Sequence, residues 1–414
     1  MTAVNAVNVT TRRSFLDVWV ISLGHTMTHW YPATFYILLP LIGNELGLNY
    51  SEIGAILTCQ YLVGAISNVP GGLVVDIVGR KTLLMALSLL WVGVPYLLMG
   101  FTHAYWLILV CSALIGIGNN LWHPAAIPLL AQWFPDRRGL AVAFHGMGGN
   151  VGDSLAPLAA GVLLTVLSWR DVVILNVFPA LIVSLLIVLY LGRSSNQKEK
   201  SDDKSSRIKP ADTLGALKTL LKNRTVMMVS TSSAFRSMTQ TALLTFLPIF
   251  LANEMGYSSA WIGGCIFGLQ AAGFIAAPIA GHLSDRMGRR RIIMSSMAMT
   301  AIVLLLMATA GRSTAFVLLI SFLGFFLFAI RAVMQAWMLD ATPRNMGGTS
   351  IGILFGGQAI GAAIGPALGG ILADTYGLIA TFYFLAFTII IANFLIFFTP
   401  TEAGVISHTR QKPS

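Results

Sequence analysis

Long apolar runs, each bounded by polar or charged residues, recur along the whole chain. Twelve of them approach or exceed the roughly 20 mostly apolar residues that a helix needs to cross a bilayer. They cover residues 17–43, 52–75, 82–101, 105–131, 139–168, 171–191, 225–252, 260–283, 292–311, 315–340, 347–373 and 379–399. The pattern predicts an all-α membrane protein with twelve transmembrane helices.

The composition supports this interpretation and excludes a soluble enzyme. Apolar residues make up 56% of the chain and charged residues 10%, and the mean hydropathy is +0.77. A soluble domain carries roughly 25% charged residues. The chain therefore has too little charge to cover a surface that faces water.

The basic residues indicate topology rather than nucleic-acid binding, although the net charge is +10. If the helices alternate across the membrane, 22 of the 26 lysines and arginines lie on one side, and only Arg170 and Arg312 lie on the other. Lysine and arginine accumulate in cytoplasmic loops. Both chain ends are therefore predicted to be cytoplasmic, with no nucleic-acid partner.

One polar stretch, residues 193–224, divides the chain into two halves. Residues 1–192 are predicted to form one six-helix bundle and residues 225–414 a second, with 193–224 as a cytoplasmic linker. Residues 213–221 of the linker are amphipathic, which suits a helix on the membrane surface. We interpret the stretch as a connector rather than a regulatory docking segment.

A repeated motif relates the two halves. The motif G-x-x-x-D-x-x-G-R-[KR] follows the second and the eighth apolar run, and its two copies are 209 positions apart. Its members are Gly72, Asp76, Gly79 and Arg80 in the first copy and Gly281, Asp285, Gly288 and Arg289 in the second. Pro157 and Pro366, in two Gly-rich runs, have the same separation. The shared offset indicates a duplicated six-helix unit, a known plan of transporters.

This motif, present in both halves of a twelve-helix chain, resembles the signature of the major facilitator superfamily. The resemblance covers nearly the whole chain and implies a secondary transporter. It also implies that the two loops act as a conformational gate, which locks the state closed toward the cytoplasm. The carboxylates suit contacts with helix N-terminal amides, and the basic residues suit lipid headgroups.

Two further segments resemble particular branches of that superfamily. Gly361, Gly365 and Pro366 are similar to a motif of drug:proton antiporters, and Gly152 and Pro157 form a weaker copy; small residues at this spacing also pack helices closely. The runs at 122–124, 137–139 and 148–152 resemble the fosmidomycin-resistance exporters. This chain has His29 where an acidic residue is expected in that branch.

The family's central cavity is lined mainly by helices 1, 4, 7 and 10, and each of these runs carries polar residues here. Ionisable groups within spanning helices are costly and usually face a cavity. The candidates for substrate binding are His25, His29, Tyr36, Asn119, Asn120, His123, Arg236, Gln240, Arg331 and Gln335. None of the four runs places an acidic residue among them, which predicts an electropositive pocket for an organic anion. The alternative is that Arg236 or Arg331 pairs internally with Asp153 or Asp340.

Asp153 is the only acidic residue deep within an apolar run. It is predicted either to exchange protons or to act as the counter-ion of a buried arginine. The histidines are the alternative proton carriers. His145 receives no role at this stage.

The sequence shows no motif for nucleotide binding, nucleophilic catalysis or metal binding. The sequence contains no phosphate-binding Gly-Lys-Ser/Thr loop, no nucleophile elbow and no ligand set with metal spacing, so neither a cofactor nor a metal is expected. An ion gradient, of protons first, is the remaining energy source.

The leading hypothesis is a monomeric exporter in the inner membrane that moves a small anion against protons. Its alternative is an importer that takes up a carboxylate by proton symport. A sensor and a membrane-embedded enzyme are the competing classes, and no appended domain or catalytic cluster supports them.

Overall fold

The computed structural model describes residues 14–192, 210–343 and 346–400, and this part of the chain is helical throughout, without strands. The first half forms α1 (Phe15–Leu46), α2 (Tyr50–Val78), α3 (Lys81–Phe101), α4 (Tyr105–Trp133), the short η1 (Pro135–Arg137), α5 (Arg138–Leu163), α6 (Trp169–Leu186) and η2 (Ile187–Leu191). The second half forms α9 (Arg224–Asn253), α10 (Ser259–Met287), α11 (Arg289–Ala310), α12 (Thr314–Asp340), α13 (Gly347–Tyr376) and α14 (Leu378–Phe397).

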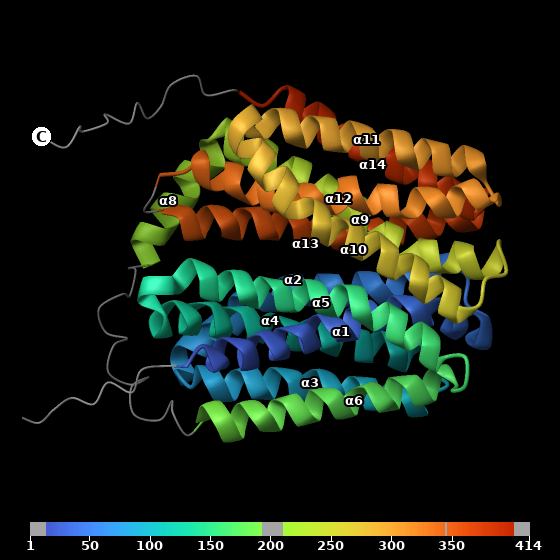
Figure 1. Cartoon of the computed structure of the whole chain (residues 1–414), viewed down its shortest axis with the longest axis horizontal. Helices are drawn as coiled ribbons and strands as arrows, with labels where there is room; N and C mark the ends of the chain where they lie inside the picture. The colour runs from blue at the N-terminus through green and yellow to red at the C-terminus, as the bar shows by residue number, and fades with distance from the viewer. Residues whose placement is uncertain (1–13, 193–209, 344–345, 401–414) are drawn as a thin grey trace, which may run out of the picture.

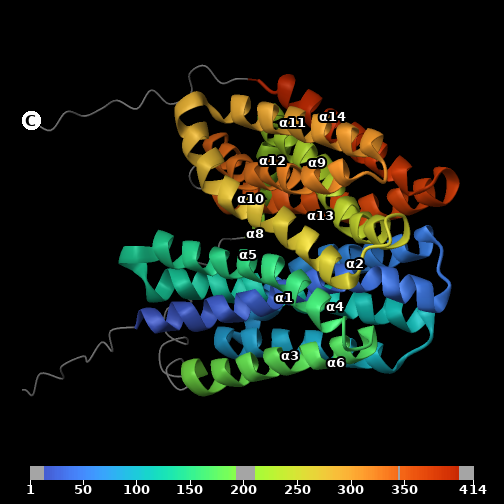
Figure 2. The same ribbon diagram turned by 45° about the vertical axis from the view of Figure 1, so that its right-hand side comes forward.

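The helices gather into two bundles, α1–α6 and α9–α14, which lie side by side in Figures 1 and 2. Between them in sequence, α8 (Pro210–Lys222) packs against α9 and α13. The amphipathic stretch of the linker is therefore helical, whereas residues 193–209 lie outside the described residues. The division into three segments, and the position of α8 against a membrane, stay predictions.

Eight of the described helices are long and apolar enough to cross a membrane by length and composition, namely α3, α4, α6 and α10–α14. The other four long helices are α1, α2, α5 and α9, and each of these carries histidine, aspartate or arginine within the helix. Such side chains lower the hydropathy of the helices that hold them. The number of crossings and the cytoplasmic location of both ends stay predictions.

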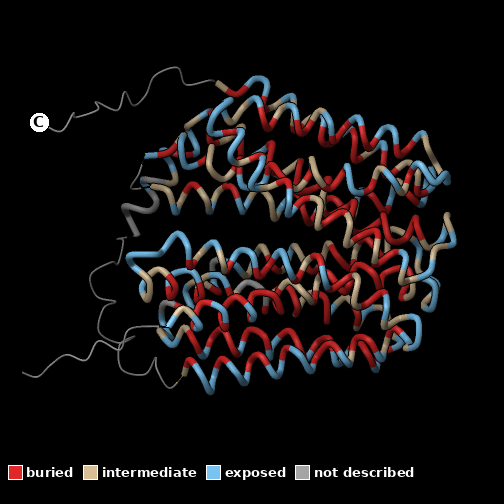
Figure 3. Tube along the Cα trace, in the orientation of Figure 1, coloured by how far each residue is buried: buried red, intermediate tan, exposed pale blue. Residues whose placement is uncertain are grey.

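Many large apolar side chains of both bundles are exposed, and Figure 3 shows how exposed positions recur along the helices. Ile182 is 67% exposed, Leu318 68% and Phe394 62%. Soluble monomers rarely expose contiguous apolar patches of this kind, whereas a bilayer stabilises them. The surface therefore fits a multi-pass membrane protein.

One predicted helix is shorter than its apolar run. The run 139–168 ends as a helix at Leu163, and α6 begins at Trp169. Ser168 accepts from the amide of Asp171 while the Asp171 carboxylate accepts from the amide of Ser168, a capping box that starts a new helix. Hydropathy continues across this turn, so the boundary was invisible to the apolar pattern.

The two repeated loops end helices in the same way. Gly79 ends α2 with φ of 66° and Gly288 ends α10 with φ of 94°. These positive values are strained for residues with a Cβ atom, which explains a glycine at both positions.

The two halves touch closely at the end opposite these loops. A Cβ atom on Gly54 would lie 2.2 Å from the carbonyl oxygen of Pro366, and one on Gly263 would lie 2.4 Å from that of Pro157. Gly54 and Gly263 are 209 positions apart, as are Pro157 and Pro366. The contacts of α2 with α13 and of α10 with α5 are therefore related by the same duplication.

Polar contacts join the halves at this end as well. The amide nitrogen of Asn44 donates to Asn253 Oδ1 at 3.4 Å, and these residues are also 209 positions apart. Asp374 of α13 accepts from the backbone amides of Tyr50 at 2.8 Å and Ser51 at 2.9 Å. A side chain of the second half thus caps α2 of the first.

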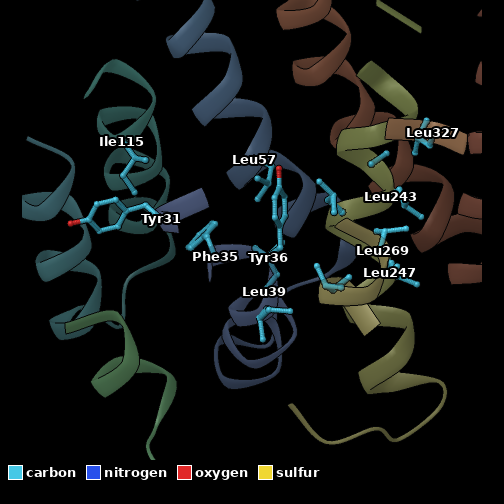
Figure 4. Close-up of a cluster of buried hydrophobic side chains, with 14 of the residues drawn as sticks. Tyr31, Phe35, Tyr36, Leu39, Leu57, Ile115, Leu243, Leu247, Leu269 and Leu327 are labelled. Carbon is cyan, nitrogen blue, oxygen red and sulfur yellow. The ribbon is translucent and has the colours of Figure 1, made fainter. Parts of the chain in front are cut away.

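Buried apolar side chains fill the bundles on both sides of the interface (Figure 4). Phe35 and Ile115 belong to the first half, and Leu243, Leu269 and Leu327 to the second. The buried apolar side chains of the two halves therefore belong to one contiguous core.

Candidate functional site

Two adjoining cavities of about 450 Å³ and about 270 Å³ lie between the halves. Six polar residues line both of them: His29, His123, Asp153, Gln240, Gln270 and Arg331. These residues come from α1, α4 and α5 of the first half and α9, α10 and α12 of the second. Polar residues on helices of both halves therefore line the same cavities.

The larger cavity extends toward the end that carries the repeated loops. Its lining includes Ala143 and Met147 near the start of α5, Ala277 in the second half of α10, and Gln335 near the end of α12. The opposite end is closed by the contacts of Gly54 and Gly263. The cavity is thus accessible from the predicted cytoplasmic end.

Arg331 is exposed within this space, and Gln335 follows it one turn later on α12. Arg236 is only 2% exposed, and its Nη1 donates to Gln240 Oε1 at 2.8 Å. Its Nε has no hydrogen-bond partner within the described parts of the chain. Arg236 therefore orients Gln240, which reaches the cavity, while Arg331 reaches the cavity itself.

The internal pairing considered for these arginines is not present. Asp340 accepts from Arg289 Nε at 3.1 Å, and Asp153 is bonded to His29. Over the ranges 14–192, 210–343 and 346–400, no ion pair joins Arg236 or Arg331 to a carboxylate. Their guanidinium charges are therefore not matched by an acidic neighbour.

Asp153 and His29 form one unit across α5 and α1. The Nδ1 of His29 donates to Asp153 Oδ2 at 3.0 Å, and both side chains are about a quarter exposed toward the cavity, 23% and 28%. Gly149 lies beside the His29 ring, so a Cβ atom there would lie 3.0 Å from His29 Nε2. The small residue lets the imidazole lie against α5.

Three more imidazoles lie next to this unit. His25 Nδ1 donates to the carbonyl oxygen of His145 at 2.6 Å, and His25 Nε2 lies 3.0 Å from His123 Nε2. The rings of His25 and His145 stack with centroids 3.9 Å apart. His25 and His145 are 5% and 2% exposed, whereas His123 faces the cavity. The sequence does not indicate a role for His145, because the 120 positions between it and His25 conceal their contact.

Sequence reasoning also missed polar residues contributed by α2 and α10. Tyr36, a predicted site residue, hydrogen-bonds through its hydroxyl to Tyr61 of α2, and both line the smaller cavity. Gln60 and Gln270 line it too. An isolated glutamine within an apolar run was the only sequence feature that could have pointed to these two residues.

The other predicted residues are distributed as follows. The side chains of Asn119, Asn120 and Asp76 lie outside the described part of the structure. At the second loop, Arg289 pairs with both Asp285 and Asp340, which links α10, α11 and α12 within one half. A Cβ atom added at Gly72 or Gly281 would meet nothing within 4 Å.

The predicted packing glycines lie against backbone of neighbouring helices. A Cβ atom on Gly361 would lie 1.9 Å from the carbonyl oxygen of Ala234, and one on Gly365 would lie 2.6 Å from that of Met238. Gly152 approaches Thr26 in the same way, at 2.4 Å. α13 therefore packs closely on α9, and α5 on α1.

Several known proteins are similar to this chain in sequence or in fold. The chain is 21% identical over 417 residues to the phosphoglycerate transporter protein of Salmonella typhimurium, covering 95% of this chain and 89% of that one. It is 24% identical over 393 residues to the fosmidomycin resistance protein of Escherichia coli, covering 93% of each. A bacterial homologue of the human lysosomal transporter Spinster, solved in an inward-facing and occupied conformation, superposes with a TM-score of 0.80 at 14% identity, covering 94% of this chain and 97% of that one.

The family resemblance carried by the paired loops is confirmed along nearly the whole length. The family model described as Major Facilitator Superfamily matches residues 19–275 and 261–414. Together with the two-bundle fold, these matches show that the chain belongs to the Major Facilitator Superfamily of transporters.

Proposed function

We propose that the protein exports a small organic anion across the inner membrane by alternating access, driven by proton entry. The observation that carries the proposal is Arg331, a permanently charged side chain in the cavity that has no carboxylate partner among the described residues. Because no carboxylate pairs with this side chain, an anion that enters the cavity can form charge-assisted hydrogen bonds with the guanidinium.

The remaining cavity groups suit an anion with polar substituents. Gln240, Gln270 and Gln335 carry amide donors, and His123 presents an imidazole. Gln240 is held by Arg236, which leaves its amide nitrogen free to donate. A volume of about 450 Å³ lies within the range of small-molecule sites.

The closed and open ends support alternating access. The contacts of α2 with α13 and of α5 with α10 close one end, and the cavity extends to the other. A separate set of contacts between the halves at the loop end would close the cavity on that side. Asp76 and Asp285 of the repeated loops are the proposed gate there. One chain supplies both halves of the cavity, so a monomer suffices.

Asp153 and His29 are the proposed proton carriers. A carboxylate bonded to an imidazole holds a proton between them, and both groups contact the cavity. The unit lies beside His123, so its protonation changes the charge presented to an anion. This relationship supports coupling of proton and anion in one site.

Two candidate functions differ in the direction in which the anion is transported. Export by proton antiport fits the similarity to the fosmidomycin resistance protein, whose name indicates protection from a compound. Uptake by proton symport is the second candidate: the phosphoglycerate transporter protein, similar over 95% of the chain, bears the name of an organic anion, but its name states no direction. Both candidates use the same cavity and the same proton carriers.

Flux in proteoliposomes tests the proposal. The full chain is reconstituted, and its orientation is measured by protease accessibility of residues 193–209. Uptake of labelled 3-phosphoglycerate, a hexuronate and fosmidomycin is then followed under pH gradients of either sign, with labelled choline as the cationic control. We expect an anion to move against the proton flux and choline not to move. Anion movement with the proton flux would replace export by symport, and flux of choline alone would overturn the anion proposal.

A further inference from the structure

The histidine cluster contains more imidazoles than the His29–Asp153 proton unit uses. His25, His123 and His145 come from α1, α4 and α5, and one ring nitrogen of each lies within 4.8 Å of the others. Imidazole nitrogens are preferred ligands of zinc, copper and nickel. Three of them converging from three helices form a ligand set that no single segment of the sequence displays.

His25 is already oriented as a metal ligand would be. Its Nδ1 donates to the backbone carbonyl of His145 at 2.6 Å, so its Nε2 carries no hydrogen in the neutral ring and can act as a ligand atom. Histidines that bind metals usually donate their second ring nitrogen to a carbonyl or carboxylate, which determines the tautomer and the ring orientation. This contact supplies that second interaction before any metal is bound.

The nitrogen spacing is close to that of a coordination sphere. His25 Nε2 and His123 Nε2 are 3.0 Å apart. Two nitrogens that bind one zinc ion at 2.0–2.1 Å in tetrahedral geometry are about 3.3 Å apart. A metal ion between them displaces the proton that they otherwise share, and the two rings need only a slight separation.

His145 supplies the independent observation. It is 2% exposed, and neither of its ring nitrogens has a hydrogen-bond partner in the described residues. Buried polar atoms without partners are rare, because each costs about 1–3 kcal/mol. One nitrogen of this ring lies within 4.8 Å of the chosen nitrogens of the other two, but the ring stacks on that of His25, so the His145 side chain must turn to direct a nitrogen at the shared ion.

Two charged side chains near the histidine cluster affect its affinity for a metal cation. Arg331 lines the same cavities as His123 and repels a cation, whereas the Asp153 carboxylate on the other side attracts it. The three ligands are neutral when they bind, so the net charge of a bound divalent ion is compensated only in part. His123 faces the cavity, which leaves one coordination position there for water.

We propose that His25, His123 and His145 bind one divalent transition-metal ion, of the zinc and cobalt class, at the edge of the cavity. The site is independent of which anion is moved and in which direction.

Metal binding to the full-length protein tests this. The protein is purified in detergent through a tag without histidine, treated with a chelator and titrated with Co²⁺, followed by visible absorption, and with Zn²⁺, followed by calorimetry. We expect one ion per chain, with absorption bands of four-coordinate Co²⁺. His145→Gln and His123→Gln should each weaken binding at least tenfold.

Controls separate loss of the site from loss of the fold. His103→Gln alters a histidine whose side chain is 77% exposed and should bind Co²⁺ like the wild type. His123 faces the cavity, so its substitution leaves the packing intact, and the thermal unfolding midpoint of each metal-free variant checks this. Wild-type protein that binds no Co²⁺, or equal affinity in all variants, would overturn the proposal.

Discussion

The Nδ1 of His29 lies 3.0 Å from Asp153 Oδ2, so the carboxylate of α5 is bonded to an imidazole of α1 and not to an arginine. The first half therefore contributes a carboxylate paired with an imidazole, and several further imidazoles. The second half contributes Arg331 and Arg236, which form no ion pair with a carboxylate in the described ranges. The proposed proton carriers and the proposed anion contact thus belong to different halves.

Substitution of this pair should uncouple transport from protons. In Asp153→Asn, accumulation driven by a pH gradient should be lost, whereas exchange of labelled for unlabelled anion should continue, because exchange needs no net proton movement. His29→Asn should lose driven accumulation in the same way. The double variant should lose no more than either single variant, since the two residues act as one unit. Proton flux and anion flux in the same proteoliposomes measure this.

Asp136→Asn provides the control, because Asp136 is exposed in η1. Driven accumulation that persists in Asp153→Asn would contradict the assignment of this unit.

Loss of Arg331 should weaken anion binding while the fold is retained. A hydrogen bond to a charged group contributes about 1.5–3 kcal/mol, so Arg331→Gln should raise the Kd of the transported anion roughly 10- to 150-fold. Arg331→Lys should retain part of the affinity, because the charge remains but the planar fork is lost. Calorimetry on detergent-solubilised protein gives the values.

The matched control is Arg312→Gln, which removes an exposed arginine paired with Glu254 far from the cavity lining. Equal affinity in Arg331→Gln and Arg312→Gln would show that the anion binds elsewhere.

Two adjacent glycines of α10 allow a sharp test of the closed end. A Cβ atom on Gly263 would lie 2.4 Å from Pro157 O, whereas one on Gly264 would meet nothing within 4 Å. Gly263→Val should therefore force the halves apart at this end and shift the population toward the opposite state. Gly264→Val should leave it unchanged.

Electron–electron distances between spin labels at Val166 and Trp261, exposed positions at that end of the two halves, report the separation. The same distance distribution in both glycine variants would mean that this contact does not determine the closed state.

The cap that Asp374 provides for α2 should also stabilise the closed end. Asp374→Ala removes the acceptor for the amides of Tyr50 and Ser51. A lost N-cap costs about 1 kcal/mol, which corresponds to roughly a fivefold change in the ratio of the two states. The same label pair measures the ratio of the two states. Asp374→Asn should retain only part of the cap, because its single acceptor oxygen replaces the two that Tyr50 and Ser51 use. A ratio that is unchanged in Asp374→Ala would assign the stability of this end to backbone packing alone.

Much of the scaffold could be read from the sequence because its signals are local or repeated. Apolar runs located the long helices within a few residues, and the offset of 209 positions that relates the two loops also relates Gly54 to Gly263 and Asn44 to Asn253 in the closed end. The run 139–168 was wrong at its end, because the turn after Leu163 is as apolar as the helix.

The candidate site was predicted only in part. His29, His123, Gln240 and Arg331 were singled out because polar residues in apolar runs are conspicuous, and the structure places all four at both cavities. His145 and Tyr61 were missed, since each gains its place only through a partner on another helix. The proposed pairing of an arginine with Asp153 failed for the same reason.

The sequence by itself determined that this protein is a duplicated helical membrane protein of the Major Facilitator Superfamily, because hydropathy and repeated motifs are properties of the chain. Only the tertiary structure decided which polar groups meet. His25 and His145 are 120 positions apart, and His29 and Asp153 are 124 apart. Contacts of this kind depend on the rotation and packing of whole helices, which no local pattern records.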